Sequence, residues 1–260
     1  MALRYSTALR DFLNEGGSIK QALANGKIKF YSGTQPATAD TAPSGTLLAT
    51  ITASSGAHTA EVRAVGSLTI SGTSGSVDTV TVNSVDILGG AVTNTGTAAG
   101  TATAVAAAIN NNPKNTMFVA SSTGSSGVVT ITAKPGLGAL PNTWAVNGTA
   151  TTTTLGTLVD MAGGVNAANG LRFGDSSSGA LVKDSAQTWS GVGVADGTAG
   201  WFRFEGSATD SGAADSSGVF IRLDGNIATS GANLNLSSTT IATGATQTIS
   251  SFTLTMPATA

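Results

Sequence analysis

The chain opens with apolar side chains at a helical spacing. Tyr5, Leu9, Phe12 and Leu13 lie three or four positions apart, so a helix would gather them on one face. Two glycines at 16–17 would end that helix. The apolar face either packs on a sheet of the same chain or docks on a neighbouring subunit. The second alternative makes Tyr5, Leu9 and Phe12 candidates for a subunit contact.

A second short helix is expected immediately after the glycines. Ser18 and Gln21 stand three residues apart, which matches a capping box in which each side chain satisfies a free backbone amide of the first turn. The Asn25-Gly26 pair is typical of a left-handed C-terminal cap. We therefore expect a small helical hairpin before the first strand.

From residue 27 onward the apolar period changes to two, which predicts strands. A helix is expected only at residues 101–111, where Pro113 ends it. In the middle of the chain, strands are expected at 27–31, 46–52, 67–71, 79–83, 85–88, 117–120, 128–132 and 149–159. Towards the C-terminus, they are expected at 170–173, 180–182, 199–204, 219–223, 234–236 and 248–256.

Turn signals recur every eight to twelve residues in the last third of the chain, a spacing typical of a β-sandwich or barrel. On the strand at 199–204, Phe202 and Phe204 share one face and Trp201 lies on the other. The two phenylalanines are expected in the core. Trp201 is either exposed at a subunit contact, where aromatic residues are enriched, or buried against the helices. The same two possibilities, exposure at a contact or burial, hold for Trp144 and Trp189.

Composition leaves little material for catalysis. More than half of the 260 residues are Gly, Ala, Ser or Thr, only 10% are charged, and there is one histidine and no cysteine. The absence of cysteine excludes disulfides, thiolate catalysis and cysteine-based metal sites. The twelve basic residues are scattered and the net charge is −2, so a nucleic-acid partner is not expected.

No apolar run reaches the roughly 18 residues of a membrane span, and residues 1–10 lack the apolar stretch of a signal peptide. We therefore expect no membrane insertion, and synthesis in the cytoplasm.

Three places in the sequence carry residues that could bind a metal ion or a ligand or take part in catalysis. His58 has no second histidine with which to complete a metal site, and no Gly-x-Ser-x-Gly elbow precedes a helix. The acids Asp210, Asp215 and Asp224 offer oxygen ligands for calcium, but they lack the spacing of a twelve-residue calcium loop and are expected to be solvated loop charges. The glycines of 191–197 are not followed by a helix, so that segment is expected to be a turn. No cofactor, metal or catalytic residue is predicted.

Two sets of segments, one towards each end of the chain, carry a family resemblance. The N-terminal set reads GKIKFYSGTQP at 26–36 and GTLLAT at 45–50. The C-terminal set reads GTAGWFR at 197–203, DG at 224–225, TSGANL at 229–234 and SSFTLT at 250–255. Together these segments resemble a family of tailed-bacteriophage structural proteins, in whose shorter members the two halves follow one another almost directly.

The intervening segment, 65–165, contains TATAVAAAIN at 101–110, VVTITAK at 128–134, NTWAV at 142–146 and MAGG at 161–164. With these motifs it resembles a module of contractile-tail sheath proteins of the Mu-like type. A sheath protein is much larger and carries elements that hand strands between subunits, and nothing in this chain matches those elements. The resemblance therefore implies the fold of the module and not a sheath role.

Together these observations predict a mainly β protein. A β-sandwich or jelly-roll-like host domain with short N-terminal helices, residues 1–64 and 166–260, would carry an inserted small α+β domain at 65–165.

The resemblance implies a non-enzymatic virion protein assembled in the host cytoplasm, associated with the tail or neck or decorating the capsid. It would act as a homo-oligomer together with other virion structural proteins. The alternative is a module of a tail tip or fibre that binds a host surface receptor or polysaccharide, with Trp144 and Trp189 as ligand contacts.

Overall fold

The chain forms two compact units, the second inserted into the first. The computed structural model describes residues 3–256. The host unit comprises Met1–Glu61 and Ala167–Ala260, and the inserted unit comprises Val62–Asn166. The expected boundaries at 64 and 166 differ from these by three residues and one residue.

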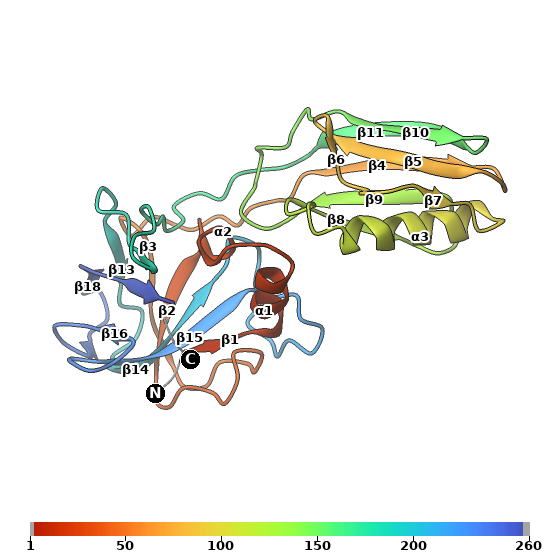
Figure 1. The fold of residues 1–260 in the computed structure, drawn as a ribbon. Helices are drawn as coiled ribbons and strands as arrows, with labels where there is room; N and C mark the ends of the chain where they lie inside the picture. The colour runs from red at the N-terminus through yellow and green to blue at the C-terminus, as the bar shows by residue number, and fades with distance from the viewer. Residues whose placement is uncertain (1–2, 257–260) are drawn as a thin grey trace. The chain divides into compact units, whose positions relative to one another are not determined.

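A nine-stranded sheet forms the frame of the host unit (Figure 1). Its main path runs β1-β15-β14-β2-β3-β13-β18, with β16 paired to β15 and β17 paired to β14. All of these pairs are antiparallel except β15 with β16. The strands are β1 (Arg4–Tyr5), β2 (Lys27–Ser32), β3 (Leu47–Ala53), β13 (Trp189–Val192), β14 (Gly197–Glu205), β15 (Arg222–Ala228), β16 (Leu234–Asn235), β17 (Thr240–Ile241) and β18 (Thr246–Ile249). A second sheet pairs β12 (Ala180–Val182) with β19 (Thr253–Thr255).

Two short helices precede β2, as the sequence predicts. In α2 (Ile19–Leu23), the Ser18 hydroxyl caps the first turn by accepting the Gln21 N–H. In α1 (Thr7–Asn14), Ser6 performs the same role for the Leu9 N–H. Because Ser6 starts the helix, the prediction that Tyr5 belongs to it is wrong, and Tyr5 pairs with Leu223 in β1 instead.

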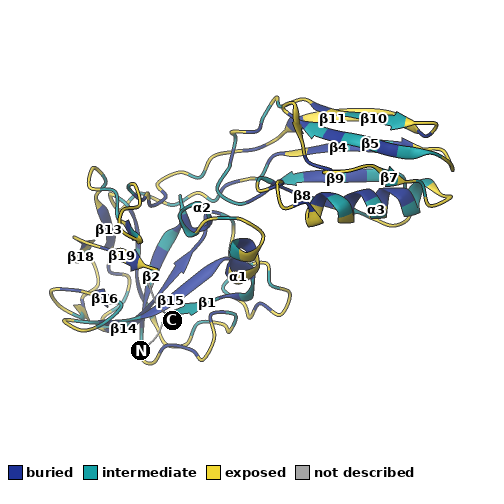
Figure 2. Ribbon diagram, in the orientation of Figure 1, coloured by how far each residue is buried: buried dark blue, intermediate teal, exposed yellow. Residues whose placement is uncertain are grey.

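The two faces of the host sheet differ in character. One face carries the apolar core, to which the helices and the β12–β19 sheet also contribute. Figure 2 shows how far the residues along these elements are buried. Phe202 and Phe204 point into this core, as expected from their alternation. On the opposite face of β14 the side chains are Trp201, Arg203 and Glu205, and all three are buried as well. This second buried face is polar, and it contains the most concentrated charge of the unit.

The inserted unit has its own sheets, helix and core. One four-stranded sheet runs β11-β4-β9-β8, and a second joins β10, β5, β6 and β7. The helix α3 (Ala98–Asn111) packs on β8, β9 and β4, and its inward side chains join the core (Figure 1). The strands are β4 (Val65–Ser71), β5 (Ser76–Val82), β6 (Val85–Asp86), β7 (Val92–Thr93), β8 (Phe118–Ser122), β9 (Val128–Ala133), β10 (Val146–Thr151) and β11 (Thr154–Ala162). The expectation of a mainly β, sandwich-like protein with few short helices is confirmed.

The strand expected at 219–223 begins three residues later, at Arg222, and continues to Ala228. The Asp215 carboxylate accepts the N–H groups of Val219 (2.8 Å) and Phe220 (2.6 Å), so these amides are not free to join a ladder. Pairing begins at Arg222 and runs through Gly225, where an added Cβ would lie 2.6 Å from the Phe202 ring. Glycine here permits close packing against an aromatic ring and does not mark a turn.

Two other strand predictions and one turn prediction need correction. The segment 149–159 forms parts of two strands, because Thr152 takes a positive φ of 66° and turns the chain between β10 and β11. The segment 248–256 is interrupted between β18 and β19. The expected turn at 191–197 begins with two residues of β13, in which Gly191 lets β3 approach so closely that an added Cβ would collide with the Thr50 carbonyl oxygen.

Backbone pairing closes both units at the points where the chain passes between them. Thr59 and Ala168 exchange two backbone hydrogen bonds in the host unit, and Val62 and Val165 exchange two in the inserted unit. In each unit, the chain therefore leaves and returns at adjacent positions. This is the arrangement in which insertion of a domain is tolerated.

We expect each unit to fold without the other. A chain in which a short Gly-Ser linker replaces residues 62–166, and a separate fragment 62–166, should each show strand-rich circular dichroism and a cooperative thermal transition. The reason is that each unit has a separate hydrophobic core. As a control, a linker replacing residues 72–150 cuts through the inserted unit and should abolish its transition. Loss of the host transition on removal of 62–166 would contradict the division.

Candidate functional site

Four side chains expected as possible surface contacts are buried. Leu9 and Phe12 pack into the host core, and Trp189 and Trp201 are fully buried. They therefore offer no surface to a partner in this structure, and the docking-arm interpretation of the helix fails for Leu9 and Phe12. Tyr5 is half-buried and packs against the same core.

Trp201 is buried, but not against the helices. Its ring stacks on Tyr31 of the neighbouring strand, with centroids 4.5 Å apart and planes 14° apart. The Arg203 guanidinium lies 5.5 Å from the ring on the same face of the sheet. Trp201 thus belongs to the polar buried face, where a cation and an aromatic ring cover it.

Trp189 lies on the opposite, apolar side, in a cluster of aromatic rings. Its ring centroid lies 5.5 Å from that of Phe173, 5.7 Å from that of Phe252 and 6.1 Å from that of Phe204. Its Nε1–H donates to the Gln187 side-chain oxygen at 2.8 Å, so its one polar atom is satisfied. This is the environment of a core tryptophan and not of a ligand contact.

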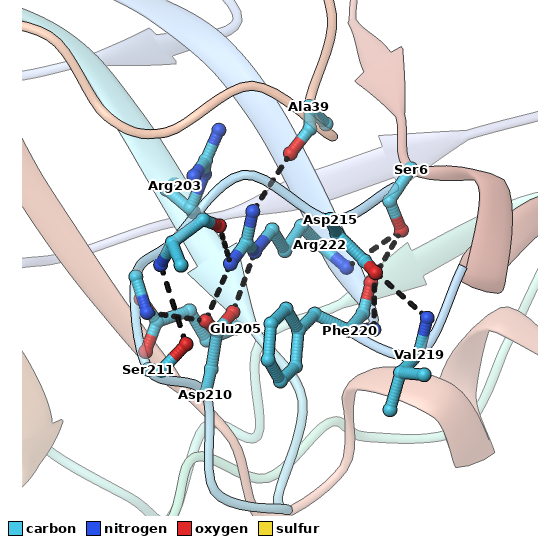
Figure 3. A network of polar contacts seen from close by, with 12 residues as sticks. Ser6, Ala39, Arg203, Glu205, Asp210, Ser211, Asp215, Val219, Phe220 and Arg222 are labelled. Carbon is cyan, nitrogen blue, oxygen red and sulfur yellow. Dashed lines mark hydrogen bonds and ion pairs between the residues drawn. The ribbon is translucent and has the colours of Figure 1, made fainter. Parts of the chain in front are cut away.

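Of the three acids considered as calcium ligands, Asp210 and Asp224 are held by arginines, and Asp215 is held by backbone amides. Figure 3 shows Asp210 beside Arg222, and Asp215 beside Val219 and Phe220. Asp224 receives two hydrogen bonds of 2.8 Å from Arg203, and Asp210 receives two of 2.6 Å from Arg222. Both arginine side chains are fully buried. Over residues 3–256, no group of three or more His, Asp or Glu side chains is placed to hold a metal ion.

Loops close over this charged face. Arg203 donates to the Thr41 carbonyl oxygen at 3.0 Å, and Arg222 donates to the carbonyl oxygens of Ala39 (3.4 Å) and Ala213 (2.8 Å). Asp215 caps its own loop through the amides of Val219 and Phe220. We call Arg203, Asp210, Arg222 and Asp224 the buried charge network. It joins two central strands to the loops that cover them.

A second charged group lies beside this network. Glu205 is buried, and its carboxylate pairs with Lys27 at 3.1 Å and with Lys29 at 2.7 Å. Both lysines come from β2, the strand next to β14. Two cations share one anion, so this group carries one net positive charge.

Burial and charge together set the ionisation of these groups. Burial alone would raise the pKa of Asp210, but hydrogen bonds from Arg222 and from the Gly212 amide bring it below its usual value. Burial raises the pKa of Asp224, and the hydrogen bonds from Arg203 oppose that shift. Burial, reinforced by the Glu205 charge, raises the pKa of Tyr31 to about 12. At neutral pH Tyr31 is therefore neutral beneath Trp201.

His58 lines an open hollow in the host unit, which we call the His58 hollow. Its volume is about 360 Å³. Burial lowers the pKa of His58, and its Nε2 donates to the Asn25 carbonyl oxygen at 3.0 Å. His58 is therefore neutral at pH 7, with one ring nitrogen engaged. The hollow is lined by Lys27, Lys29, Thr50, Thr52, Ser55, Gly56, Ala57, His58, Val192 and Val194.

Trp144, in the inserted unit, is the one of the three tryptophans that stays partly exposed. It lies in a hollow of about 210 Å³, which we call the Trp144 pocket. Phe118 meets the Trp144 ring edge-on, with centroids 6.2 Å apart. The pocket is lined by Val82, Asn83, Val85, Ile87, Lys114, Asn115, Thr116, Met117, Phe118 and Trp144. Of the two tryptophans expected to contact a ligand, Trp144 lines an open pocket and Trp189 is buried in the core.

Sequence reasoning did not single out the arginines of the buried charge network. A usable signal was present, because charged residues alternate with large apolar ones at 202–205 and 221–224. That alternation places opposite charges on one face of two strands. Which acid faces which arginine depends on strand pairing, and here Arg203 lies directly opposite Asp224.

Comparisons of the chain with models of protein families, with curated proteins and with solved structures give no match. Within the part of the chain that the structure describes, no helix is long and apolar enough to cross a membrane.

Proposed function

We propose that the protein is a non-enzymatic structural component of a tailed-bacteriophage virion that acts through oligomeric assembly. It would be associated with the tail or neck, or would decorate the capsid, after assembly in the host cytoplasm. Its partners would be copies of itself and other virion structural proteins. The proposal begins from the resemblance of its framing segments and of its inserted module to such proteins.

The observation that carries assembly is a set of exposed apolar side chains at one edge of the inserted unit. Strand β11 is the end strand of its sheet, and Leu158 and Val159 on it are exposed. Val65 starts the adjacent strand β4, and the paired Val62 and Val165 lie just before β4 and just after β11; all three are exposed. A gathering of apolar side chains on a soluble protein is typical of an interaction surface.

We expect side chains rather than backbone to make this contact. The pairing of β11 with β4 shifts register twice, between Leu155 and Leu158 and between Val159 and Ala162. Such irregularities disturb the row of free backbone groups that a partner strand would need. A contact made by apolar side chains at the edge of the sheet does not need that regular row.

The charges of the host unit support a structural role. The residues of the buried charge network pair with one another and with loop carbonyl groups, so most of their ionisable atoms, though not Arg203 Nη1, are engaged in holding the fold. Among the basic residues, carboxylates pair with Lys20, Lys27, Lys29, Arg172, Arg203 and Arg222, which supports leaving nucleic acid out of the partners.

Size-exclusion chromatography with light scattering tests the proposal. The wild-type chain should elute as a stable multiple of the chain mass. The double variant Leu158→Lys, Val159→Lys should shift to the mass of one chain, because burying two lysines in an apolar contact is unfavourable.

The matched control is Leu140→Lys, Val219→Lys, which makes the same chemical change at two other exposed positions. It should keep the wild-type mass. A wild-type chain that is monomeric at every concentration would contradict self-assembly in isolation.

A second candidate function is favoured by one observation, the position of Trp144 in an open pocket of the inserted unit. A receptor- or carbohydrate-binding module of a tail tip or fibre would present such a ring to a host surface ligand.

A further inference from the structure

We infer that the Trp144 pocket binds a single ring of an acidic saccharide, a sugar that carries a carboxylate. This inference rests on the second candidate function and gives it a site and a ligand class. It does not depend on the oligomeric state of the chain.

The floor and walls of the pocket suit the apolar face of a sugar ring. Val82, Ile87 and Phe118 are buried beneath it, and Trp144 is half-buried, so part of its ring remains accessible. A pyranose presents C–H groups on one face, and these pack on an aromatic ring. The volume of about 210 Å³ is below the ~300–1,000 Å³ of sites for drug-sized ligands, which favours one ring over a larger ligand.

The rim supplies polar groups that are free to bind hydroxyls. Asn83, Lys114 and Thr116 are exposed, and their side chains form no hydrogen bond or ion pair within residues 3–256. A largely apolar site with a few polar groups at its edge is the usual composition of a small-ligand site. These groups stand where the hydroxyls of a ring packed on Trp144 would need partners.

The charge of the pocket favours an acidic sugar over a neutral one. Lys114 is the one charged residue among those that line the pocket. A carboxylate on the ligand would therefore meet an unpaired cation, and no lining carboxylate would repel it. This complementarity also favours an acidic saccharide over an apolar peptide side chain, which would leave Lys114 and the amide of Asn83 without partners.

The pocket is held in shape by its own backbone and side chains. The buried Asn115 amide donates to the carbonyl oxygens of Ile109 (2.9 Å) and Phe118 (3.0 Å), which fixes the wall beside Lys114. Asn83 and Ser84 both take positive φ values, 50° and 65°, in the tight turn between β5 and β6. The Asn83 N–H donates to the Ala145 carbonyl oxygen at 3.0 Å, tying this turn to the segment that carries Trp144.

Tryptophan fluorescence of the full-length chain gives a local readout. Trp189 and Trp201 are fully buried in the host unit, so a change on adding saccharide reports Trp144. The probes are a galacturonic acid tetramer and a galactose tetramer, which differ in the carboxylate. We expect the acidic tetramer to change the fluorescence saturably and to bind more tightly than the neutral one. Isothermal titration calorimetry supplies the affinities.

Variants then assign the site. Trp144→Ala should weaken binding of the acidic tetramer by about tenfold or more, since it removes the stacking surface. Lys114→Gln should weaken it by about threefold and abolish the preference for the acidic probe, because an exposed ion pair contributes modestly. The control Lys20→Gln makes the same charge change on the host unit, outside the pocket, and should bind as the wild type does.

Several results would overturn the inference. Equal affinity for the two tetramers would contradict the claim that the pocket selects an acidic saccharide. Tighter binding of a phenylalanine-bearing tetrapeptide would contradict it as well. If Trp144→Ala left saccharide binding unchanged, the Trp144 pocket would not be the binding site, although the second candidate function would still stand. Absence of binding to either tetramer, with the light-scattering mass unchanged, would overturn the saccharide site and leave the assembly role untouched.

Discussion

Replacing Asp224 by alanine should lower the free energy of unfolding of the host unit by about 3–5 kcal/mol. The change leaves the Arg203 guanidinium fully buried without its carboxylate, while its Nη2 keeps only the Thr41 carbonyl oxygen. An uncompensated buried charge is strongly destabilising, because water can no longer reach it and no anion replaces the one removed.

The measurement is urea unfolding in a Trp144→Phe background. The remaining tryptophans, Trp189 and Trp201, belong to the host unit, so fluorescence then follows that unit alone. Separating the two units matters because a two-domain chain need not unfold in one step.

Two further variants show that the effect comes from the lost ion-pair partner. Arg203→Met combined with Asp224→Leu removes both charges, and it should recover most of the stability lost in the single variant. Asp175→Ala breaks the exposed pair with Lys20 and should leave the host transition where it was. If the single and double variants were equally destabilised, packing rather than charge would explain the loss.

Replacing Trp189 by alanine should destabilise the host unit by about 3–5 kcal/mol. The side chain is fully buried among Phe173, Phe204 and Phe252, and its removal would leave a cavity that rings already packed together cannot fill. The hydrogen bond to Gln187 would also be lost.

Urea unfolding of this variant can be followed by circular dichroism, which needs no tryptophan in the core. Trp189→Phe should lose less, since it keeps an aromatic ring in the cluster. Trp144→Ala should leave the host transition unchanged, because Trp144 lies in the inserted unit. A Trp189→Ala chain as stable as the wild type would contradict the burial of this ring and restore Trp189 as a candidate contact.

The variants Trp144→Ala and Trp189→Ala compare two tryptophans that the sequence alone does not distinguish. Trp144 and Trp189 stand in similar polar, small-residue surroundings in the sequence, yet one lines an open pocket and the other closes a core. Of the three tryptophans, only Trp144, in the inserted unit, lines an open pocket.

Much of the local structure follows from the sequence alone. The cap at Ser18, the helix ended near Pro113 and the two-residue alternation of Phe202 and Phe204 each depend on neighbours within a few positions. Low charge and abundant β-branched and small residues likewise predict a mainly β chain. These features are local or summed over the chain, so no knowledge of distant contacts is needed to predict them.

Other features depend on which distant segments pair. Alternation separates Trp201 from Phe202, but it does not reveal that loops near Ala39 and Ala213 cover the face on which Trp201 lies. The partners Arg203 and Asp224 are 21 positions apart and meet only because β14 pairs with β15 in one register. A charged residue has the same sequence signature whether it meets water or an opposite charge.

The Trp144 pocket belongs to this second kind. Its lining comes from three segments, around Val82, Lys114 and Trp144, that the folding of the inserted unit brings together. The sequence by itself determined the kind of fold, its caps and the faces of its strands, because these depend on periodicity and short-range hydrogen bonding. The tertiary structure decided which face is covered, which charges pair and which tryptophan stays open, because burial is a property of surfaces that meet across long separations in the chain.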